Sequence, residues 1–492
     1  MKSLKTVETS VDGSQFFEKF VSKRIPAIIK GLPDDADFKA RNWTDLDYLQ
    51  KKAGDVQVMI EPMHPESKQF GTDIERISVP FKQFLESLKE DGPHPYLTTQ
   101  YSEQDDDQQT VFPPPANALK EDYPIVPRIM GNLFLQQVNL WLGKSKDGSS
   151  SGLHHDFHDN LYCLLQGKKR FVLYPPQELP NLYPYGKLDN LHPNGLISYK
   201  DGPVRADGLP IRVALQTRVK AIEKQLEALP KPSKGKGKDK ALSKERKALM
   251  KAHDDALDEL AQYTLEAEDE GEVDDFDALM GGLDGSEDGS VRGAGPSGST
   301  GRTQEEDMDE EDEDEELKGQ VLGGDDDSDD SDQENQDESE EPSSFSRIPT
   351  AFLHKHLNLP TTSIPPSDIL PDSFPNLKKT TEPYVVELNA GDMLYLPASW
   401  WHEVTSTSVP EDEGTGGVHM AFNYWFYPPT NDDFDHPYED QLVWGYFREK
   451  LGESANQNGR EDRASGLDGS SGKRKNEDSV PNAVQSKKKA KK

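Results

Sequence analysis

The sequence predicts a mainly β domain with flanking helices: a jelly roll of two antiparallel sheets, interrupted by a long, acidic, disordered insert. Many short strand patterns follow one another at close spacing, separated by turns rich in Gly, Pro, Asn and Asp, which is typical of a β-sandwich or barrel. The composition changes abruptly near residue 205 and again near residue 345. We therefore expect one packed domain formed by residues 1–204 and 345–452, an insert at 205–344 and a tail at 453–492.

The elements of the packed domain follow in a simple order. Helical and strand patterns alternate at first, and strands alone follow once the turns become frequent. The apolar positions predict three helices and two strands in the first part, at 14–24, 25–31, 43–54, 56–62 and 79–91. Later strands are predicted at 95–101, 134–143, 160–167, 169–176, 384–397, 401–408 and 419–429. An amphipathic helix is predicted at 439–452.

Composition narrows the class of protein. The 492-residue chain carries a formal net charge of −35, is 33% hydrophobic and has a mean hydropathy of −0.84, so part of it cannot pack a core. This charge argues against a general nucleic-acid binder and favours basic partners. The single cysteine, Cys163, excludes an intramolecular disulfide and the common structural zinc sites, and is expected in the core. No signal-peptide pattern and no membrane-span pattern is present, so we expect a soluble intracellular protein.

The insert and the tail are polar for different reasons. Residues 216–270 are charged and show helical patterns in pieces, without a sustained apolar stripe, whereas the charges of residues 305–344 are almost all acidic. For the acidic stretch, a solvated spacer and a patch that attracts basic proteins such as histones both remain open. The tail ends in two lysine-rich clusters, "GKRK" and "KKKAKK", whose spacing is that of a bipartite nuclear import signal. A merely solvated tail is the alternative, so the expected location is nuclear, cytoplasmic or both.

Three histidines and two aspartates precede the strand pattern at 160–167. Alternate side chains of an extended segment point the same way, so His154 and Asp156 share one side while His155 faces the other. His402, which follows two tryptophans at the start of a later strand, offers a third ligand. Two histidines and one carboxylate leave one face of a metal open, as in non-haem Fe(II) oxygenases. Without the insert, a run of short strands can span the separation between Asp156 and His402.

These residues stand within longer motifs that resemble one family. "PAIIKG", "YLTTQY", "VNLWLG", "LHHDFHDNLYCLLQGKKRFVLYPP", "AGDMLYLPASWWHEV" and "FNYWF" are similar to segments of the Jumonji-C (cupin-8) oxygenases, which use Fe(II), 2-oxoglutarate and O₂. The resemblance covers nearly all of the non-acidic sequence. It implies a double-stranded β-helix of cupin type. Within the family the chain looks closest to the branch of Jumonji-C-only protein hydroxylases, in particular to its (3S)-lysyl hydroxylase.

The resemblance assigns roles to individual positions. It makes His154, Asp156 and His402 the iron ligands. Lys169 matches the base that pairs with the distal carboxylate of 2-oxoglutarate, and Tyr96 matches a tyrosine hydrogen-bonded to the same carboxylate. An unpaired ammonium at the start of the apolar segment "FVLYPP" would be costly, which agrees with a role in binding an anion.

Further positions match the surroundings of the cosubstrate. Ser151 stands where some members carry threonine, and its hydroxyl can still donate a hydrogen bond. Asn160 and Asn423 match amides near the keto-acid end of 2-oxoglutarate, and Trp425 would back the site two residues later on the same strand face. His419 is expected beside the site rather than in it.

Other polar residues near the motif are assigned no chemistry. His155 and His158 are expected to support the site or lie on the surface, although the position of His155 leaves open which of the neighbouring imidazoles binds the metal. Glu403 follows His402 on a strand and should point away from the metal.

The function expected from this resemblance is Fe(II)- and 2-oxoglutarate-dependent hydroxylation of a protein, with a substrate that is basic or bears lysine. Histone lysine demethylation is the alternative enzyme. A catalytically silent cupin that binds basic proteins through its insert is the alternative without catalysis. In the resembling hydroxylases a C-terminal helix pair forms a dimer, so helix 439–452 is expected either to form a homodimer or to pack on its own barrel.

Overall fold

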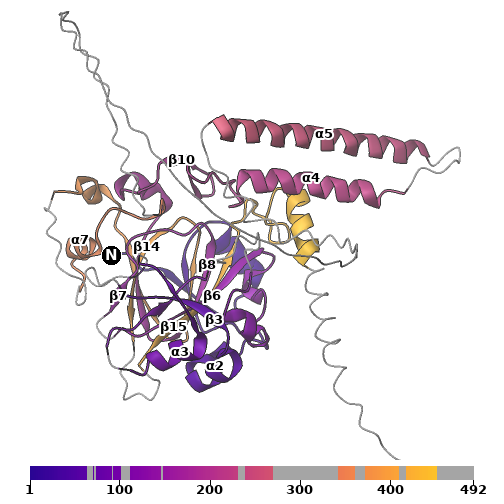
Figure 1. Ribbon diagram of the computed structural model, residues 1–492. Helices are drawn as coiled ribbons and strands as arrows, with labels where there is room; N and C mark the ends of the chain where they lie inside the picture. Colours follow the sequence, from indigo (N-terminus) through magenta and orange to yellow (C-terminus); the bar gives the residue numbers. More distant parts are fainter. Residues whose placement is uncertain are drawn as a thin grey trace, which may run out of the picture.

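The computed structural model describes residues 1–63, 70, 74–90, 92–100, 111–145, 148–230, 239–269, 342–360, 372–408 and 417–451. Two β-sheets form a barrel with helices around it (Figure 1). The larger sheet runs in the order β1 (Lys5–Glu8), β2 (Ala27–Lys30), β13 (Met393–Leu396), β8 (Asp159–Gln166), β15 (His419–Phe426), β6 (Leu135–Gly143), β5 (Tyr96–Leu97), β3 (Gln57–Glu61) and β4 (Ile77–Pro80). The smaller sheet runs in the order β12 (Tyr384–Asn389), β9 (Lys168–Tyr174), β14 (Trp401–Thr407) and β7 (Ser149–Ser150).

Most strand pairs in the two sheets are antiparallel, which confirms the predicted jelly roll. β8 lies between β13 and β15, and β9 lies between β12 and β14, so segments from both sides of the insert alternate within each sheet. The exception is β1, which runs parallel to β2. A separate hairpin is formed by β10 (Leu188–Leu191) and β11 (Ile197–Tyr199). Because each sheet needs strands from both halves of the chain, the barrel closes only when these halves meet.

β8 shows how the sequence pattern produces two packed faces. Leu161, Cys163 and Leu165 belong to the core between the larger sheet and the helices, whereas Tyr162 and Leu164 belong to the core between the two sheets. This alternation is the period of two expected of a strand, and both faces are apolar because both are covered. Polar residues on the inner face of β8 therefore point into the barrel.

The helices on the larger sheet come mainly from the N-terminal part. The predicted helix 14–24 is α1 (Gly13–Phe16), which continues into a π-helical turn at Phe17–Val21. α2 (Leu46–Ala53) begins where the Asp45 carboxylate accepts hydrogen bonds from two backbone N–H groups. α3 (Phe81–Ser87) buries three apolar residues under β3 and β4, and α7 (Thr350–Leu357) lies beyond the smaller sheet.

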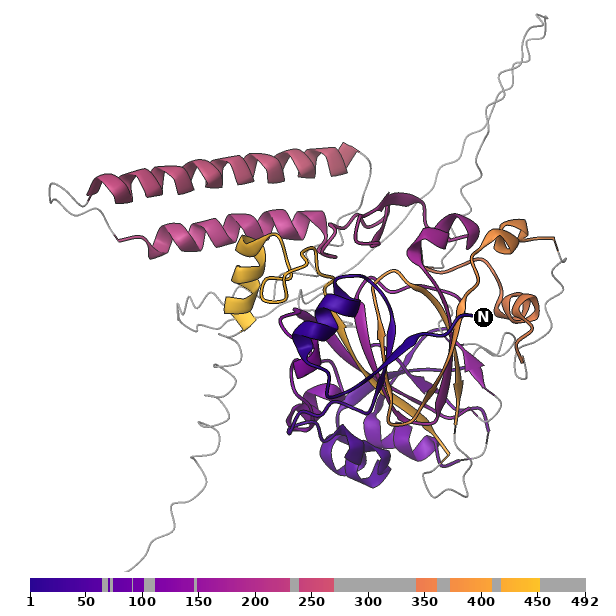
Figure 2. The same cartoon turned by 180° about the vertical axis from the view of Figure 1, so that it is seen from behind.

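The first part of the predicted insert belongs to the packed domain. α4 (Ile211–Ala228) and α5 (Asp239–Asp269) form a helical hairpin on the side of the barrel opposite α7, as both views show (Figures 1 and 2). Leu209, Val213 and Ala214 are about 1% exposed and pack in the main core. The domain boundary predicted at residue 204 is therefore too early. The sequence showed no continuous apolar stripe along this segment, because only the first turns of α4 pack in the main core.

The rest of the insert and the tail are not covered by the structure. Residues 305–341 of the predicted acidic stretch, and the whole tail predicted at 453–492 with its lysine clusters, lie outside the described residues. Nuclear import through the tail stays a prediction. Among the described residues, no helix is long and apolar enough to cross a bilayer.

The helix at 441–451 packs against its own chain. Trp444 is 1% exposed, stacks on Tyr438 with ring centroids 4.1 Å apart, and donates from Nε1 to Asp207 at 3.0 Å. Lys224 of α4 and Glu449 form an ion pair at 3.1 Å. Of the two alternatives, packing on its own domain is thus realised, and the homodimer stays a prediction.

Candidate active site

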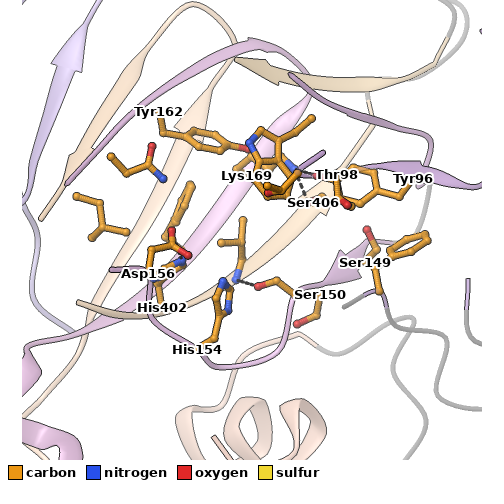
Figure 3. Close-up of a pocket in the computed structure, with 18 of the residues that line it drawn as sticks. Tyr96, Thr98, Ser149, Ser150, His154, Asp156, Tyr162, Lys169, His402 and Ser406 are labelled. Atoms are coloured by element: carbon orange, nitrogen blue, oxygen red, sulfur yellow. Dashed lines mark hydrogen bonds and ion pairs between the residues drawn. The ribbon is translucent and has the colours of Figure 1, made fainter. Parts of the chain in front are cut away.

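One pocket opens between the two sheets, and both supply its walls (Figure 3). The walls combine aliphatic and aromatic side chains with a small set of hydroxyl, amide and charged groups, as is usual for a small-molecule site. From the larger sheet come Glu61, Tyr96, Trp141, Asn160, Tyr162, Leu394, Leu396 and Trp425. From the smaller sheet come Ser149, Ser150, Lys169, Phe171, His402, Val404 and Ser406.

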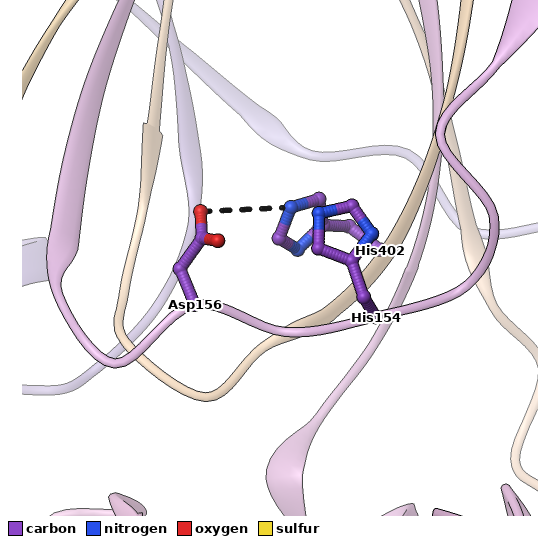
Figure 4. A group of neighbouring side chains, drawn as sticks. All are labelled: His154, Asp156 and His402. Carbon is purple, nitrogen blue, oxygen red and sulfur yellow. Dashed lines mark ion pairs between the residues drawn. The ribbon is translucent and has the colours of Figure 1, made fainter. Parts of the chain in front are cut away.

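The three predicted metal ligands meet at one end of this pocket (Figure 4). Their ligand atoms all lie within 4.8 Å of one another, and His402 Nε2 is 3.7 Å from Asp156 Oδ2. The contact between the two histidines follows from the backbone, because His154 and His402 form an antiparallel bridge with N–H···O distances of 3.0 and 2.7 Å. Residues far apart in the sequence are thereby fixed side by side.

Backbone carbonyls orient both imidazoles. His154 Nδ1 lies 3.1 Å from the Gly152 carbonyl oxygen, and His402 Nδ1 lies 2.8 Å from that of Trp400. Each Nδ1 therefore carries the proton and donates it, which leaves each Nε2 lone pair for a metal. Burial, with a smaller contribution from His402, lowers the pKa of His154 to about 4. The imidazole is accordingly neutral at pH 7, as a ligand must be.

A buried ion pair fixes the turn on which the ligands stand. The Asp159 carboxylate pairs with the Arg24 guanidinium, accepts from Tyr395 Oη at 2.7 Å, and accepts from the Ala398 N–H at 2.9 Å. These contacts tie the start of β8 to the end of β13, which leads into His402. Sequence reasoning did not single out Asp159, because a carboxylate one position before a strand carries no sign of its partners.

The remaining histidines of the motif lie outside the group formed by His154, Asp156 and His402, called the metal cluster below. His155 is 1% exposed, faces away from the pocket, and its Nε2 lies 2.8 Å from Tyr199 Oη. His158 stacks beside Trp425, with ring centroids 6.1 Å apart. Burial lowers the pKa of both imidazoles, to about 3 and about 4 respectively. Both side chains therefore stay neutral and act as packing groups near the turn.

A buried cation lies at the other end of the pocket. The Lys169 side chain is 2% exposed, and its Nζ donates to Ser406 Oγ at 2.5 Å and lies 3.5 Å from Tyr96 Oη. Lys169 and Ser406 are direct partners in the β9–β14 register, so the strand pairing itself produces this contact. Burial lowers the pKa of Lys169 to about 7. Neither hydroxyl carries a charge, so an anion entering the pocket would compensate the ammonium.

The predicted amides form a short chain of hydrogen bonds. Asn423 Nδ2 donates to Asn160 Oδ1 at 3.1 Å, and Trp141 Nε1 donates to Asn423 Oδ1 at 2.9 Å. Asn160 and Trp425 line the pocket, whereas Asn423 is fully buried behind it and fixes the Asn160 amide. Ser151 lines the pocket as well. Its hydroxyl, however, donates to the Gly152 carbonyl at 3.0 Å and accepts from Val404 N–H, so its proton points at the backbone.

Two further residues lie beside the pocket. His419 is 1% exposed, and its ring centroid is 5.5 Å from that of Tyr96. Glu403 is fully buried on the opposite side of β14 from His402, where it accepts from Ser150 Oγ at 2.6 Å and lies 3.1 Å from His354 Nε2. Glu403 thus connects β14 to α7 and does not face the metal cluster.

Several lining residues were missed from the sequence. Ser406 stands four positions after His402, and Tyr162 stands two positions after Asn160; the period of two along each strand was the signal that could have identified them. Phe345 also lines the pocket, and its ring stacks on the His154 imidazole with centroids 4.9 Å apart. No local pattern indicates Phe345, because its position depends on a pairing between distant segments.

The donor set fits the metal and cosubstrate that the motifs imply. Two neutral imidazoles and one carboxylate on one side of a point suit Fe(II) and leave further coordination positions for a chelating keto acid. The buried Lys169 ammonium, with only hydroxyl partners among the described residues, suits the far carboxylate of a dicarboxylic acid. Both ends of 2-oxoglutarate therefore find complementary groups in one pocket.

Comparisons with known proteins agree with the fold and the site. The cupin-like domain family matches residues 13–432. "JmjC domain-containing protein 4" of Schizosaccharomyces pombe is 37% identical over 90% of this chain and 88% of its own length. "Lysine-specific demethylase JMJ31" of Arabidopsis thaliana is 28% identical over 36% of this chain and 37% of its own length. The human "Bifunctional peptidase and (3S)-lysyl hydroxylase JMJD7" is 42% identical over 43 residues, which are 9% of this chain and 13% of that protein.

These matches confirm the resemblance seen in the motifs. The family match includes all three metal-cluster residues and Lys169, and the long alignment to the fission-yeast protein extends through most of the chain. The chain therefore belongs to the cupin-like family of Jumonji-C domain proteins.

Proposed function

We propose that this protein is an Fe(II)- and 2-oxoglutarate-dependent hydroxylase that acts on a lysine of a protein substrate. The observation that carries this proposal is the presence, in one pocket, of the ligand set His154, Asp156 and His402 at one end and the buried Lys169 side chain at the other. A metal hydrolase would need the three ligands but has no use for a buried cation facing them. A silent scaffold would need neither.

The residues of the chain would divide the work as follows. With 2-oxoglutarate and O₂, bound Fe(II) supplies oxidation of a C–H bond, with succinate and CO₂ as coproducts. His154, Asp156 and His402 would hold the metal on one side, and their backbone contacts keep them in place. Lys169 and Tyr96 would bind and orient the distal carboxylate, which fixes the direction in which the keto acid lies.

Apolar side chains would keep water from the reacting centre. Leu394, Leu396, Val404 and Phe171 line the same pocket, and none of them can donate or accept a proton. Excluding water from the pocket would matter because it would direct oxidation to the substrate rather than to solvent or to the protein.

The lysyl part of the proposal draws on charge and on one relative. Glu61 lines the pocket at 2% exposure, and its Oε2 lies 4.0 Å from Arg76 Nη2. Arg76 lines the pocket as well and pairs with this carboxylate, so Glu61 gives no preference for a cation. The charge that favours a basic, lysine-bearing substrate is the net charge of −35 of the whole chain. The relative named as a (3S)-lysyl hydroxylase aligns over a short segment, which supports the same substrate class.

Lysine demethylation is the second candidate, because other relatives are named lysine-specific demethylases. The two reactions differ in product. A hydroxylase adds one oxygen atom to the peptide, whereas a demethylase removes a methyl group and releases formaldehyde.

One assay separates these reactions. The full chain, incubated with Fe(II), ascorbate, 2-oxoglutarate and peptides from a lysine-rich protein pool, should produce succinate and peptides that gain one oxygen atom on lysine by tandem mass spectrometry. The His154→Ala protein is the matched control and should do neither. Loss of methyl groups with formaldehyde release, and no oxygen gain, would replace the hydroxylase with the demethylase.

A further inference from the structure

We propose that the segment 342–348, which begins at the end of the acidic stretch, completes the metal site, and that Phe345 is a positioning residue for the ligand His154. This inference rests on the proposed function only in taking His154 as a metal ligand. None of the family motifs includes this segment, which lies between β11 and β12 in the chain.

The backbone of the segment pairs directly with the ligand turn. Phe345 and His154 form an antiparallel bridge, the His155 N–H donates to the Ser344 carbonyl at 3.1 Å, and the Ser346 N–H donates to the Leu153 carbonyl at 2.8 Å. His154 also bridges His402. The ligand therefore occupies the middle of three extended segments, with one neighbour from each side.

The side chain of Phe345 adds a second constraint on the imidazole. The two rings lie nearly parallel, at 16°, with centroids 4.9 Å apart, and Phe345 lines the pocket beside the ligand. The hydrogen bond from Nδ1 to the Gly152 carbonyl fixes which edge of the imidazole faces the backbone. The stacked phenyl ring of Phe345 restricts rotation of the imidazole plane. Together they favour one orientation, in which Nε2 would be available to a metal held with Asp156 and His402.

The segment is itself held firmly to the domain. The Tyr185 N–H donates to the Phe345 carbonyl at 2.9 Å, Ser346 Oγ donates to the Leu182 carbonyl, and Ile348 is 2% exposed in the core beside the smaller sheet. The buried contact between His354 and Glu403 fastens α7, which follows directly. Phe345 is therefore a fixed wall of the site.

Metal binding tests this role without turnover. Mn(II) affinity of the full chain, measured by calorimetry without cosubstrate, should fall about tenfold in Phe345→Ala, the lower end of the usual effect of removing a group that orients a metal ligand. Phe345→Tyr keeps the ring and should bind Mn(II) like the unmodified protein. Phe352→Ala is the matched control, because Phe352 packs against Phe374 in the same part of the core and does not line the pocket.

A second measurement guards against simple loss of folding. Phe345→Leu keeps an apolar side chain but loses the stacked ring, so the Co(II) absorption bands should shift while the melting temperature stays near that of Phe352→Ala. Unchanged Mn(II) affinity in Phe345→Ala, or equal weakening in Phe352→Ala, would overturn the positioning role. Retained Mn(II) binding in His154→Ala would instead refute the metal site, and with it the proposed function.

Discussion

The two ends of the pocket are built in different ways. At the metal end, the ligands stand on a turn and at the start of a strand, and backbone carbonyls of Gly152 and Trp400 orient the imidazoles. At the cosubstrate end, Lys169 stands within a paired strand, and among the described residues its hydrogen-bond partners are the hydroxyls of Ser406 and Tyr96. One end relies on backbone geometry and the other on side chains in register.

This difference predicts different consequences of substitution. Three ligands act together on one metal, so losing one removes the reaction. A buried ammonium is unfavourable until an anion pairs with it, so its loss weakens cosubstrate binding in a graded way and leaves the metal in place. Substitutions at each end, measured in the same assays, test this distinction.

The largest effect is expected at the metal end. His154→Ala, Asp156→Ala and His402→Ala should each reduce succinate formation below detection and abolish Mn(II) binding, because each removes one of three ligands. His155→Ala should retain most of the activity, since its ring contacts Tyr199 outside the pocket. If His155→Ala were as inactive as His154→Ala, the ligand assignment would be wrong.

A smaller, selective effect is expected at the cosubstrate end. Lys169→Met should raise the KM for 2-oxoglutarate by about 10- to 100-fold, the equivalent of a charged hydrogen bond of about 1.5–3 kcal/mol. Mn(II) affinity should stay unchanged. Ser406→Ala, which removes only a neutral partner of Lys169, is the comparison and should raise KM less. Loss of Mn(II) binding in Lys169→Met would show that the two ends are not independent.

The pH dependence of cosubstrate binding should reflect the same lysine. Because burial lowers the pKa of Lys169 from 10.5 to about 7, the empty protein loses this proton above about pH 7 and must regain it to bind a dicarboxylate. The affinity for 2-oxoglutarate should therefore fall about tenfold per pH unit above about 7, with proton uptake visible in calorimetry across buffers. Lys169→Met should show no such slope.

The same shift has a consequence for stability. Since the pKa of Lys169 is lower in the folded state than in the unfolded state, the folded protein binds fewer protons between about pH 7 and 10.5. The free energy of unfolding of the empty protein should rise with pH across that window, as far as this group contributes. Chemical denaturation of the unmodified and Lys169→Met proteins at several pH values would isolate the contribution.

The smallest effect is expected in the insert, from which no residue of the described pocket lining comes. Replacing residues 272–340 with a short Gly/Ser linker should leave the melting temperature and the rate of succinate formation nearly unchanged, because shortening the connection between α5 and residue 342 should alter closure entropy only slightly. Replacing residues 209–340 is the contrasting variant. It removes Leu209, Val213 and Ala214 from the core and should lower soluble yield. Equal behaviour of the two variants would argue against the role of α4 in the core.

Much of this comparison was already predicted by local sequence pattern. The strands that carry Lys169, Asn160 and His402 were recognised from apolar runs between turn residues, and the period of two placed His154 and Asp156 on one side. Roles for Lys169 and Tyr96 came from family motifs, and the structure places the two side chains in contact distance. Most strand boundaries differed by a few residues, as is common where hydrogen bonding rather than composition ends a strand. The single strand predicted at 384–397 was wrong, because it is two strands, β12 and β13, which lie in different sheets.

Other features had no local signal. The sequence by itself determined most strands, their faces and the buried position of Cys163, because each depends on neighbours within a few residues. The three-ligand set followed from the family motifs, and closure of the barrel brings His402 to His154. Only the tertiary structure decided that α4 belongs to the core, that Asp159 is paired with Arg24, and that Phe345 stacks on His154. The physical reason is that these contacts join segments whose pairing is selected by closure of the whole barrel, and no periodicity within either segment encodes its partner.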